Sequence, residues 1–258
     1  MANTLQGTTV LVTGAGGGLG KVIATTYLEA GANVAICDIN EERLGQARSE
    51  LESTQRFLAV NTDITDEAAV TKLVDTVVAK FGRLDIVVNN AGMTDKFDPV
   101  GSLSKEHWDR IINLNLTGSF LVFKAAVNTM EKQSSGVIIQ IGSTSSYQGT
   151  SAGAAYTASK HGVAGLVKNT AGFYGPKGIY SVGLMVGGMV DTNIQDSFAA
   201  LGGFNTDAYS MSISAAFKPE MAIRTKDVAK YCVFLADRDI ASSCNGSMVQ
   251  FNRNYPVA

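Results

Sequence analysis

The stretch TTVLVTGAGGGLG, residues 8 to 20, decides the fold. Its first half is a continuous apolar and β-branched run, which is typical of a strand buried on both faces of a sheet. The glycines that follow allow a tight turn, and the segment from Gly18 to Ala30 has the pattern of a helix that Gly31 ends. A strand, a glycine-rich turn and a helix in direct succession predict the first unit of a parallel α/β sheet.

The same alternation continues to the end of the chain. We expect further strands at 33–38, 56–63, 84–92, 136–143, 179–186 and 247–251. We expect further helices at 41–51, 66–81 (with Asp66 as its N-cap), 104–130, 156–174 and 225–235, with a looser stretch at 187–219. Right-handed crossovers then give a single-domain, Rossmann-type doubly wound parallel sheet of about seven strands over residues 1–258, with helices on both faces.

Composition narrows the class of protein. The 258 residues are 45% hydrophobic and 17% charged, with a formal net charge of −2 and no block of basic residues, so we expect neither a nucleic-acid nor a membrane partner. The start, MANTLQGTT, lacks a charged region followed by an apolar one, and we expect a soluble, cytoplasmic protein. Three cysteines and two histidines, at no metal-ligand spacing, indicate a reducing compartment and no metal site.

The glycine-rich turn also has a chemical use. Without side chains its backbone can approach a pyrophosphate, and the following helix presents N–H groups and a partial positive charge. A turn of this kind can also exist without any ligand. Asp38, 18 residues after Gly20 at the end of the second expected strand, is placed as a ribose-binding carboxylate would be. The combination predicts dinucleotide binding.

Asp38 favours NAD over NADP. A carboxylate accepts both ribose hydroxyls of NAD and repels the extra phosphate of NADP, which is usually held by Arg or Lys. Gly17 and Ile39 are not basic. Arg43 is near, but on a helix it can pair with Asp38 or face solvent.

Tyr156 is followed four positions later by Lys160. On a helix the two side chains lie on one face about one turn apart. A cation beside a phenol favours the phenolate and so can turn a group with a reference pKa of about 10 into a base. The same spacing also occurs at an ordinary helix start, with the tyrosine packed and the lysine solvated.

Several short motifs in order identify a family resemblance. They are TGAGGGLG (13–20), Asp63 after the third strand, NNAG (89–92), NLN (113–115), Ser143, and Tyr156 with Lys160. From Thr8 to Phe251 the chain resembles the short-chain dehydrogenase/reductase family, of the compact type of roughly 250 residues. Each motif alone is weak, and their order and spacing together are specific.

The resemblance implies a set of cofactor contacts. The corresponding positions are Gly14, Gly17, Gly18, Leu19, Gly20, Asp38, Ile39, Asp63, Ile64, Asn90, Ala91, Gly92, Tyr156, Lys160, Gly188, Val190 and Thr192. Asp63 can instead be a turn or cap residue. Thr192 corresponds to the residue that contacts the nicotinamide carboxamide.

The resemblance also implies four catalytic residues and no metal. Tyr156 would exchange a proton with the substrate oxygen, with Lys160 favouring the phenolate and binding the nicotinamide ribose. Ser143, 13 residues before Tyr156, would orient the substrate oxygen, although Thr144 and Ser145 are neighbouring hydroxyls. Asn115 would hold a water in the proton path, or could simply cap or kink its helix.

Three departures from the family pattern stand out. The fifth strand ends Gln140-Ile141-Gly142-Ser143 where Asn-x-Ser-Ser is frequent. Gly187-Gly188 replaces the usual Pro-Gly, and Gly183 stands where asparagine is frequent. Losing the proline adds freedom to the loop on the nicotinamide side.

The expected activity is therefore hydride transfer between NAD(H) and a secondary alcohol or ketone. A substrate lid is expected at about 187–220, where residues 193–220 are rich in Phe, Ala, Met and Ser and contain Lys218 as their one cation. This favours a neutral, apolar small molecule, unless these side chains pack on the protein or on a neighbouring subunit. A homotetramer or homodimer is expected, with Val163, Ala164 and Leu166 available for helix packing at an interface or in the core.

Three other activities remain open. One is an NADPH-dependent biosynthetic ketoreductase, against which Asp38 stands. Another is a dinucleotide-binding regulator without turnover, against which Ser143, Tyr156 and Lys160 stand. The third is an epimerase or dehydratase, which usually has a longer chain.

Overall fold

The computed structural model describes residues 5–52, 55–194 and 196–255. Within them the chain forms a seven-stranded sheet in the order β3-β2-β1-β4-β5-β6-β7, with every pairing parallel. The strands are β1 (Thr9–Thr13), β2 (Asn33–Asp38), β3 (Phe57–Asn61), β4 (Ile86–Asn89), β5 (Gly136–Ile141), β6 (Ile179–Val186) and β7 (Met248–Phe251). The predicted doubly wound sheet is confirmed, and its order reverses between β1 and β4, where such sheets bind ligands.

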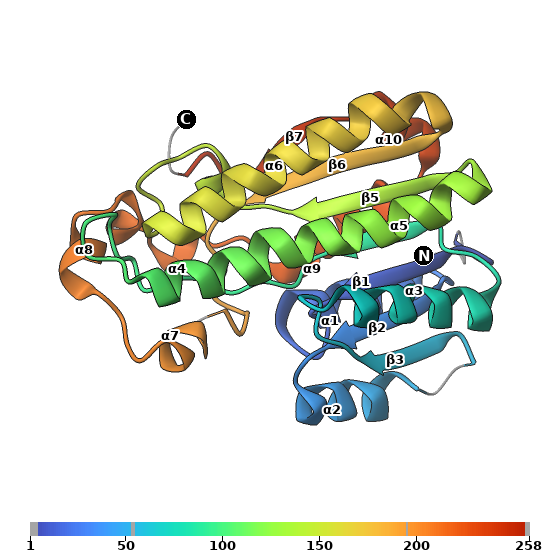
Figure 1. The fold of residues 1–258 in the computed structure, drawn as a ribbon, viewed down its shortest axis with the longest axis horizontal. Helices are drawn as coiled ribbons and strands as arrows, with labels where there is room; N and C mark the ends of the chain where they lie inside the picture. Colours follow the sequence, from blue (N-terminus) through green and yellow to red (C-terminus); the bar gives the residue numbers. More distant parts are fainter. Residues whose placement is uncertain (1–4, 53–54, 195, 256–258) are drawn as a thin grey trace.

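Helices cover both faces of this sheet, as Figure 1 shows. They are α1 (Gly18–Glu29), α2 (Glu41–Leu51), α3 (Glu67–Phe81), α4 (Lys105–Ile112), α5 (Ser119–Gln133), α6 (Ala154–Tyr174), α9 (Thr225–Phe234) and α10 (Arg238–Ser243). One core joins the sheet to α1, α2 and α9, and a second joins it to α3, α5 and α6. The inner strands β1, β4, β5 and β6 are buried on both faces, which explains their largely apolar sequences, whereas the edge strands β3 and β7 are partly exposed.

The ends of α3 follow from its sequence. The Asp66 carboxylate accepts the backbone N–H groups of Ala68 and Ala69, as predicted for an N-cap. Gly82 ends the helix with φ of 80°, a left-handed conformation that suits glycine.

The expected helix over 104–130 is interrupted. Ser104 caps α4, but a π-helical turn, Asn113–Gly118, separates α4 from α5. Turns of this kind inside helices are frequent at functional sites. Asn115, for which the sequence left open a role in capping or kinking its helix, lies inside this turn.

The continuous helical run Lys105–Gln133 reaches, by length and mean hydropathy alone, what a membrane-crossing helix needs. Half of its most apolar window is buried inside the protein. Core helices meet the same criterion, and α5 packs on α3 and on the sheet.

Residues 187–220, called the 187–220 segment below, form short pieces beyond the carboxyl ends of the strands (Figure 1). They comprise α7 (Asp196–Ala200), α8 (Thr206–Ser210) and two single 3₁₀ turns, Ile213–Ala216 and Pro219–Met221. The expectation of a looser stretch is confirmed, and its few short helices show no long apolar period.

The glycines at the end of β6 have a structural reason. The Gly187 N–H donates to the Phe251 carbonyl at 3.0 Å, a hydrogen bond that proline cannot make. A Cβ on Gly188 would lie 2.5 Å from the Phe217 ring, and one on Gly183 would lie 2.1 Å from the Met248 sulfur. The Gly187 hydrogen bond therefore ties the start of the loop to β7, and the close neighbours leave no room for a side chain at Gly183 or Gly188. The added freedom expected from losing the proline stays a prediction.

Candidate active site

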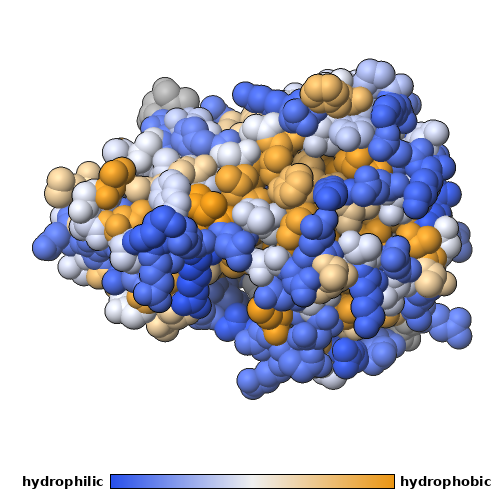
Figure 2. Space-filling model, viewed as in Figure 1, coloured by the Kyte–Doolittle hydropathy of each residue, from blue (hydrophilic) through white to orange (hydrophobic). Residues whose placement is uncertain are grey.

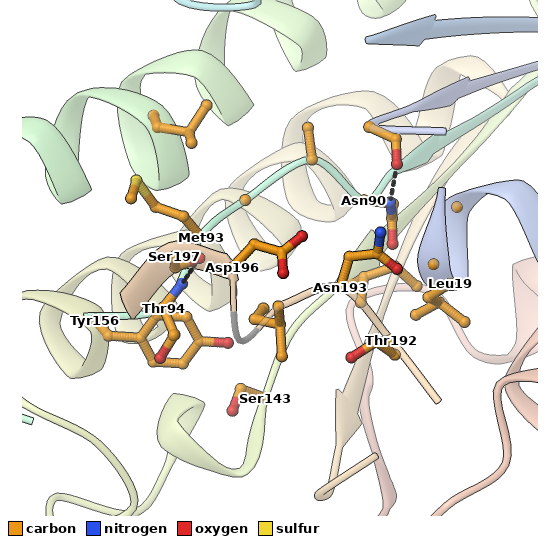
Figure 3. Close-up of a pocket in the computed structure, with 18 of the residues that line it drawn as sticks. Leu19, Asn90, Met93, Thr94, Ser143, Tyr156, Thr192, Asn193, Asp196 and Ser197 are labelled. Carbon is orange, nitrogen blue, oxygen red and sulfur yellow. Dashed lines mark hydrogen bonds between the residues drawn. The ribbon is translucent and has the colours of Figure 1, made fainter. Parts of the chain in front are cut away.

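A cavity of about 900 Å³ opens at the carboxyl ends of the strands. Its wall is formed by the glycine-rich turn, the ends of β4 and β5, the first turn of α6 and the 187–220 segment. Figure 2 shows the molecular surface hollowed beside this segment. Figure 3 shows Tyr156, Ser143, Thr192 and Asn90 converging on the cavity from these different elements.

The glycine-rich turn packs too closely for side chains. A Cβ on Gly14, whose φ is +62°, would lie 2.7 Å from the Ala91 Cα, and one on Gly20 would lie 2.4 Å from the Gly14 carbonyl oxygen. The Asn90 amide donates to the carbonyls of Thr13 and Gly14 and so joins the turn to the end of β4. The turn at the start of α1 is thus a rigid cradle of backbone, which fits a pyrophosphate.

Asp38 is fixed at the end of β2. Its carboxylate accepts the backbone N–H of Gly16 and that of Asn40, each at 2.9 Å. Arg43 does not pair with it, contrary to one of the two expectations for this residue. The guanidinium of Arg43 instead forms an ion pair with Asp196 of α7, across the cavity mouth.

Three further predicted cofactor contacts line the same cavity. Ile39 is 66% exposed, Ile64 is buried, and both line the wall. Asp63 also lines it, while one of its oxygens accepts the N–H and hydroxyl of Thr65. Asp63 therefore does have the turn role that the sequence left open, in a position that also faces the cavity.

Ser143 lines the cavity together with Tyr156 and affects the pKa of its phenol. A hydrogen bond from Ser143 lowers the pKa of Tyr156, but burial outweighs it and raises that pKa to about 12. Thr144 and Ser145 also line the cavity, but of these hydroxyls only Ser143 affects the pKa of Tyr156. In the protein alone, burial therefore opposes the phenolate that the neighbouring lysine was expected to favour.

Lys160 is buried, with 6% of its surface exposed. Its Nζ lies 5.4 Å from the centroid of the Tyr156 ring and donates to the Ile141 carbonyl at 3.1 Å. Burial lowers the pKa of Lys160 to about 8. The lysine thus stays mostly charged at pH 7, and the one-turn spacing predicted from the sequence is confirmed.

Asn115 does not line the cavity. Its side-chain oxygen accepts the Met93 N–H at 2.9 Å, and its amide donates to the Met93 carbonyl at 2.8 Å and to the Ser159 hydroxyl at 3.2 Å. The side chain therefore joins the segment after β4 to α6. A water held by Asn115 in the proton path stays a prediction. We assign Asn115 as a positioning residue.

Asp95 is a site residue that the sequence reasoning missed. It is 1% exposed, and its carboxylate accepts the N–H groups of Phe97, Gly153 and Tyr156. Gly153 is the N-cap of α6 and offers no capping side chain, so Asp95 supplies that role from a distant segment. Burial raises the pKa of Asp95, whose charge in turn raises that of Tyr156. The signal was an acidic residue three positions after NNAG.

Three cofactor contacts were predicted in the loop after β6, and two of them, Gly188 and Thr192, line the cavity. The Thr192 hydroxyl is buried without a hydrogen-bond partner among the described residues and lies on the cavity wall, which fits a ligand amide. Val190 is 61% exposed and lies outside the wall, where Met189 lies, so its contact with a cofactor stays a prediction. All other predicted site residues except Asn115 line the cavity. The described residues contain no group of three His, Cys, Asp or Glu that could hold a metal.

Comparison with known proteins agrees with this geometry. The short chain dehydrogenase family profile matches residues 8–200. A short chain dehydrogenase/reductase, dpchG, of Colletotrichum higginsianum is 41% identical, over 97% of this chain and 94% of its own. The 3beta-hydroxysteroid dehydrogenase 2 of Eggerthella lenta is 39% identical over 68% of each chain. The crystal structure of a 3-ketoacyl-(acyl-carrier-protein) reductase from Brucella melitensis, complexed with NADH, superposes with a TM-score of 0.83 at 27% identity, covering 98% of this chain and 99% of that one. The chain therefore belongs to the short chain dehydrogenase family.

Proposed function

We propose that the protein transfers hydride between NAD(H) and a neutral, apolar secondary alcohol or ketone. One observation carries this proposal: Ser143, Tyr156 and Lys160 meet in a single cavity that has a backbone cradle and Asp38 at one end and aromatic side chains at the other. The cradle, Asp38 and the unpartnered Thr192 hydroxyl are the residues that would hold the dinucleotide.

The chain's own residues supply the proton chemistry. A bound nicotinamide supplies hydride exchange at its ring and, when oxidised, one positive charge. Tyr156, protonated near neutral pH, donates its proton to a ketone oxygen while Ser143 orients that oxygen. In the oxidation direction Tyr156 must lose its proton first, and the Lys160 ammonium favours the resulting phenolate.

Two observations support NAD over NADP. The Asp38 carboxylate is fixed by two backbone N–H groups with its charge directed at the adenosine end of the cavity. Arg43, which could hold a 2′-phosphate, is neutralised by Asp196. The relative complexed with NADH shows that a chain of this fold takes that cofactor.

A fluorescence titration with NADH and NADPH, on the wild type and on Asp38→Ala, tests the cofactor assignment. We expect tight NADH binding, weak NADPH binding, and a smaller difference in the variant. A preference for NADPH would instead indicate a ketoreductase, and binding of neither would contradict the proposed activity.

The surface offers a site for self-association, which we propose to be dimeric or tetrameric. Phe120 on α5 and Phe173 on α6 are 45% and 71% exposed, and Figure 2 shows apolar side chains gathered over these helices. Val163 and Ala164, which were also considered for an interface, are buried inside the subunit. Light scattering of Phe173→Glu against the wild type tests this surface.

A further inference from the structure

Four aromatic rings form one wall of the cavity beyond Tyr156. They are Phe97, from the segment after β4, with Phe198, Phe204 and Tyr209 of the 187–220 segment; together they are called the aromatic cluster below. Phe204 contacts the other three, with centroid distances of 4.7 Å to Phe198, 5.3 Å to Phe97 and 5.1 Å to Tyr209. All four rings are only partly buried and line the cavity, so part of their apolar surface is open to a ligand.

Phe97 is held in an unusual backbone conformation. Its φ is +69°, which a bulky residue rarely adopts without a reason in the surrounding structure. Asp95 accepts its N–H, while Asn205 donates its backbone N–H to the Lys96 carbonyl and its side-chain amide to Asp98. The 187–220 segment thus fixes the residues on both sides of Phe97 and keeps its ring in the cluster.

Ser151 provides a polar group on the same cavity wall. The residue is 8% exposed, and its hydroxyl has no hydrogen-bond partner among the described residues. Its carbonyl accepts the Ser214 hydroxyl at 2.8 Å, which ties it to the 187–220 segment. A buried hydroxyl without a partner is unfavourable, and a ligand oxygen would satisfy it.

We propose that the substrate is a neutral, ring-bearing secondary alcohol or ketone with a second oxygen, away from the reacting carbon, that accepts a hydrogen bond from Ser151. The proposal rests on the proposed function and specifies its substrate class. Edge and face contacts with the aromatic cluster favour a compact ring over a flexible chain, because the ring loses less conformational freedom on binding. One hydroxyl without a charge suits a neutral oxygen better than a carboxylate.

Three ketones of closely similar size separate these features in reduction by NADH. They are 4-methoxycyclohexanone, 4-ethylcyclohexanone and 2-octanone. The first two differ only by an oxygen in place of a methylene, and the last has no ring. We expect kcat/KM to fall from the first to the last, by about fivefold at the oxygen step, as for one neutral hydrogen bond.

Two variants test which side chain is responsible for each difference in kcat/KM between the ketones. Ser151→Ala should remove the preference for methoxy over ethyl and leave 4-ethylcyclohexanone unchanged, whereas the exposed Ser243→Ala should change neither. Phe204→Leu, which preserves an apolar side chain in the segment, should lower kcat/KM for both ring ketones and not for 2-octanone. Equal losses on all three ketones in either variant, or equal wild-type activity on all three, would overturn this inference and leave the proposed function standing. If the protein binds NADH and reduces none of them, the proposed function itself fails.

Discussion

The carboxylate of Asp95 accepts the backbone N–H of Tyr156 at 2.9 Å. A side chain from the segment after β4 therefore fixes the first turn of α6. The contact brings a negative charge toward the phenol, whose pKa it raises. Asp95 therefore both caps α6 and raises the pKa of Tyr156.

Asp95→Asn should shift the pH dependence of turnover. Removing the charge lowers the pKa of Tyr156, so the limb of the kcat/KM profile that reports its deprotonation moves to lower pH during alcohol oxidation. The variant should also lose about 1 kcal/mol of stability, because both carboxylate oxygens accept backbone N–H groups and an amide has only one accepting oxygen. Asp66→Ala, at the cap of α3, should lose similar stability without moving the pH profile, and a shift in that control would contradict the assignment.

Tyr156→Phe should reduce turnover by several orders of magnitude, because no other group is placed to exchange the proton in the same way. NADH binding should be nearly unchanged, since the cradle and Asp38 are untouched. Steady-state kinetics and fluorescence titration measure the two effects, and near-full activity would show that another group is the acid.

Lys160→Met should make the protein more stable at pH 7 while abolishing activity. The gap between the pKa of about 8 in the fold and the ordinary 10.5 corresponds to about 3 kcal/mol against burying the charged lysine. The Ile141 carbonyl keeps a partner, because the Gln140 amide also donates to it.

The lowered pKa of Lys160 also makes the free energy of unfolding depend on pH. Between about pH 8 and 10.5 the unfolded chain binds more protons than the folded one, so wild-type stability from this group rises with pH and the advantage of Lys160→Met shrinks. Urea unfolding at pH 7 and pH 10 measures this. Lys168→Met, an exposed position on the same helix, is the control, and a destabilised Lys160→Met at pH 7 would refute the argument.

Asp196→Ala should strengthen NADPH binding by about tenfold, because Arg43 is then available for the 2′-phosphate. An exposed ion pair contributes little to folding, so the melting temperature should stay the same. Asp207→Ala removes another exposed acid from the 187–220 segment and should leave the cofactor ratio unchanged. An unaltered ratio in both variants would show that Asp38 alone selects the cofactor.

Gly187→Pro, which restores the frequent family residue, should destabilise this chain by about 1–3 kcal/mol. It removes the N–H that bonds to Phe251 and brings a Cβ within 2.9 Å of the Asn252 Cα. Gly149→Pro places the same change in an exposed turn with no neighbour within 4 Å of a Cβ, and it separates this effect from a general one of proline. Equal stability of wild type and Gly187→Pro in urea would contradict it.

Local patterns predicted the sheet, the helices and most of the cavity wall, because strands, caps and the Tyr156–Lys160 spacing depend on residues close in sequence. The features that the sequence did not predict depend on contacts between residues far apart in the chain. Asp95 meets Tyr156 across 61 positions, and Arg43 meets Asp196 across 153. Val190 lies in a loop without a period, so nothing local indicates that its side chain faces solvent.

The 187–220 segment contacts both ends of the cavity, through Asp196 on Arg43 at one end and Ser214 on Ser151 at the other. On the proposed function, release of a bound dinucleotide would require movement of the same segment that would cover the substrate. Opening of this segment, slower than proton transfer, would then set the turnover number. If opening of the 187–220 segment limits the rate in this way, a rapid first turnover is followed by a slower steady-state rate.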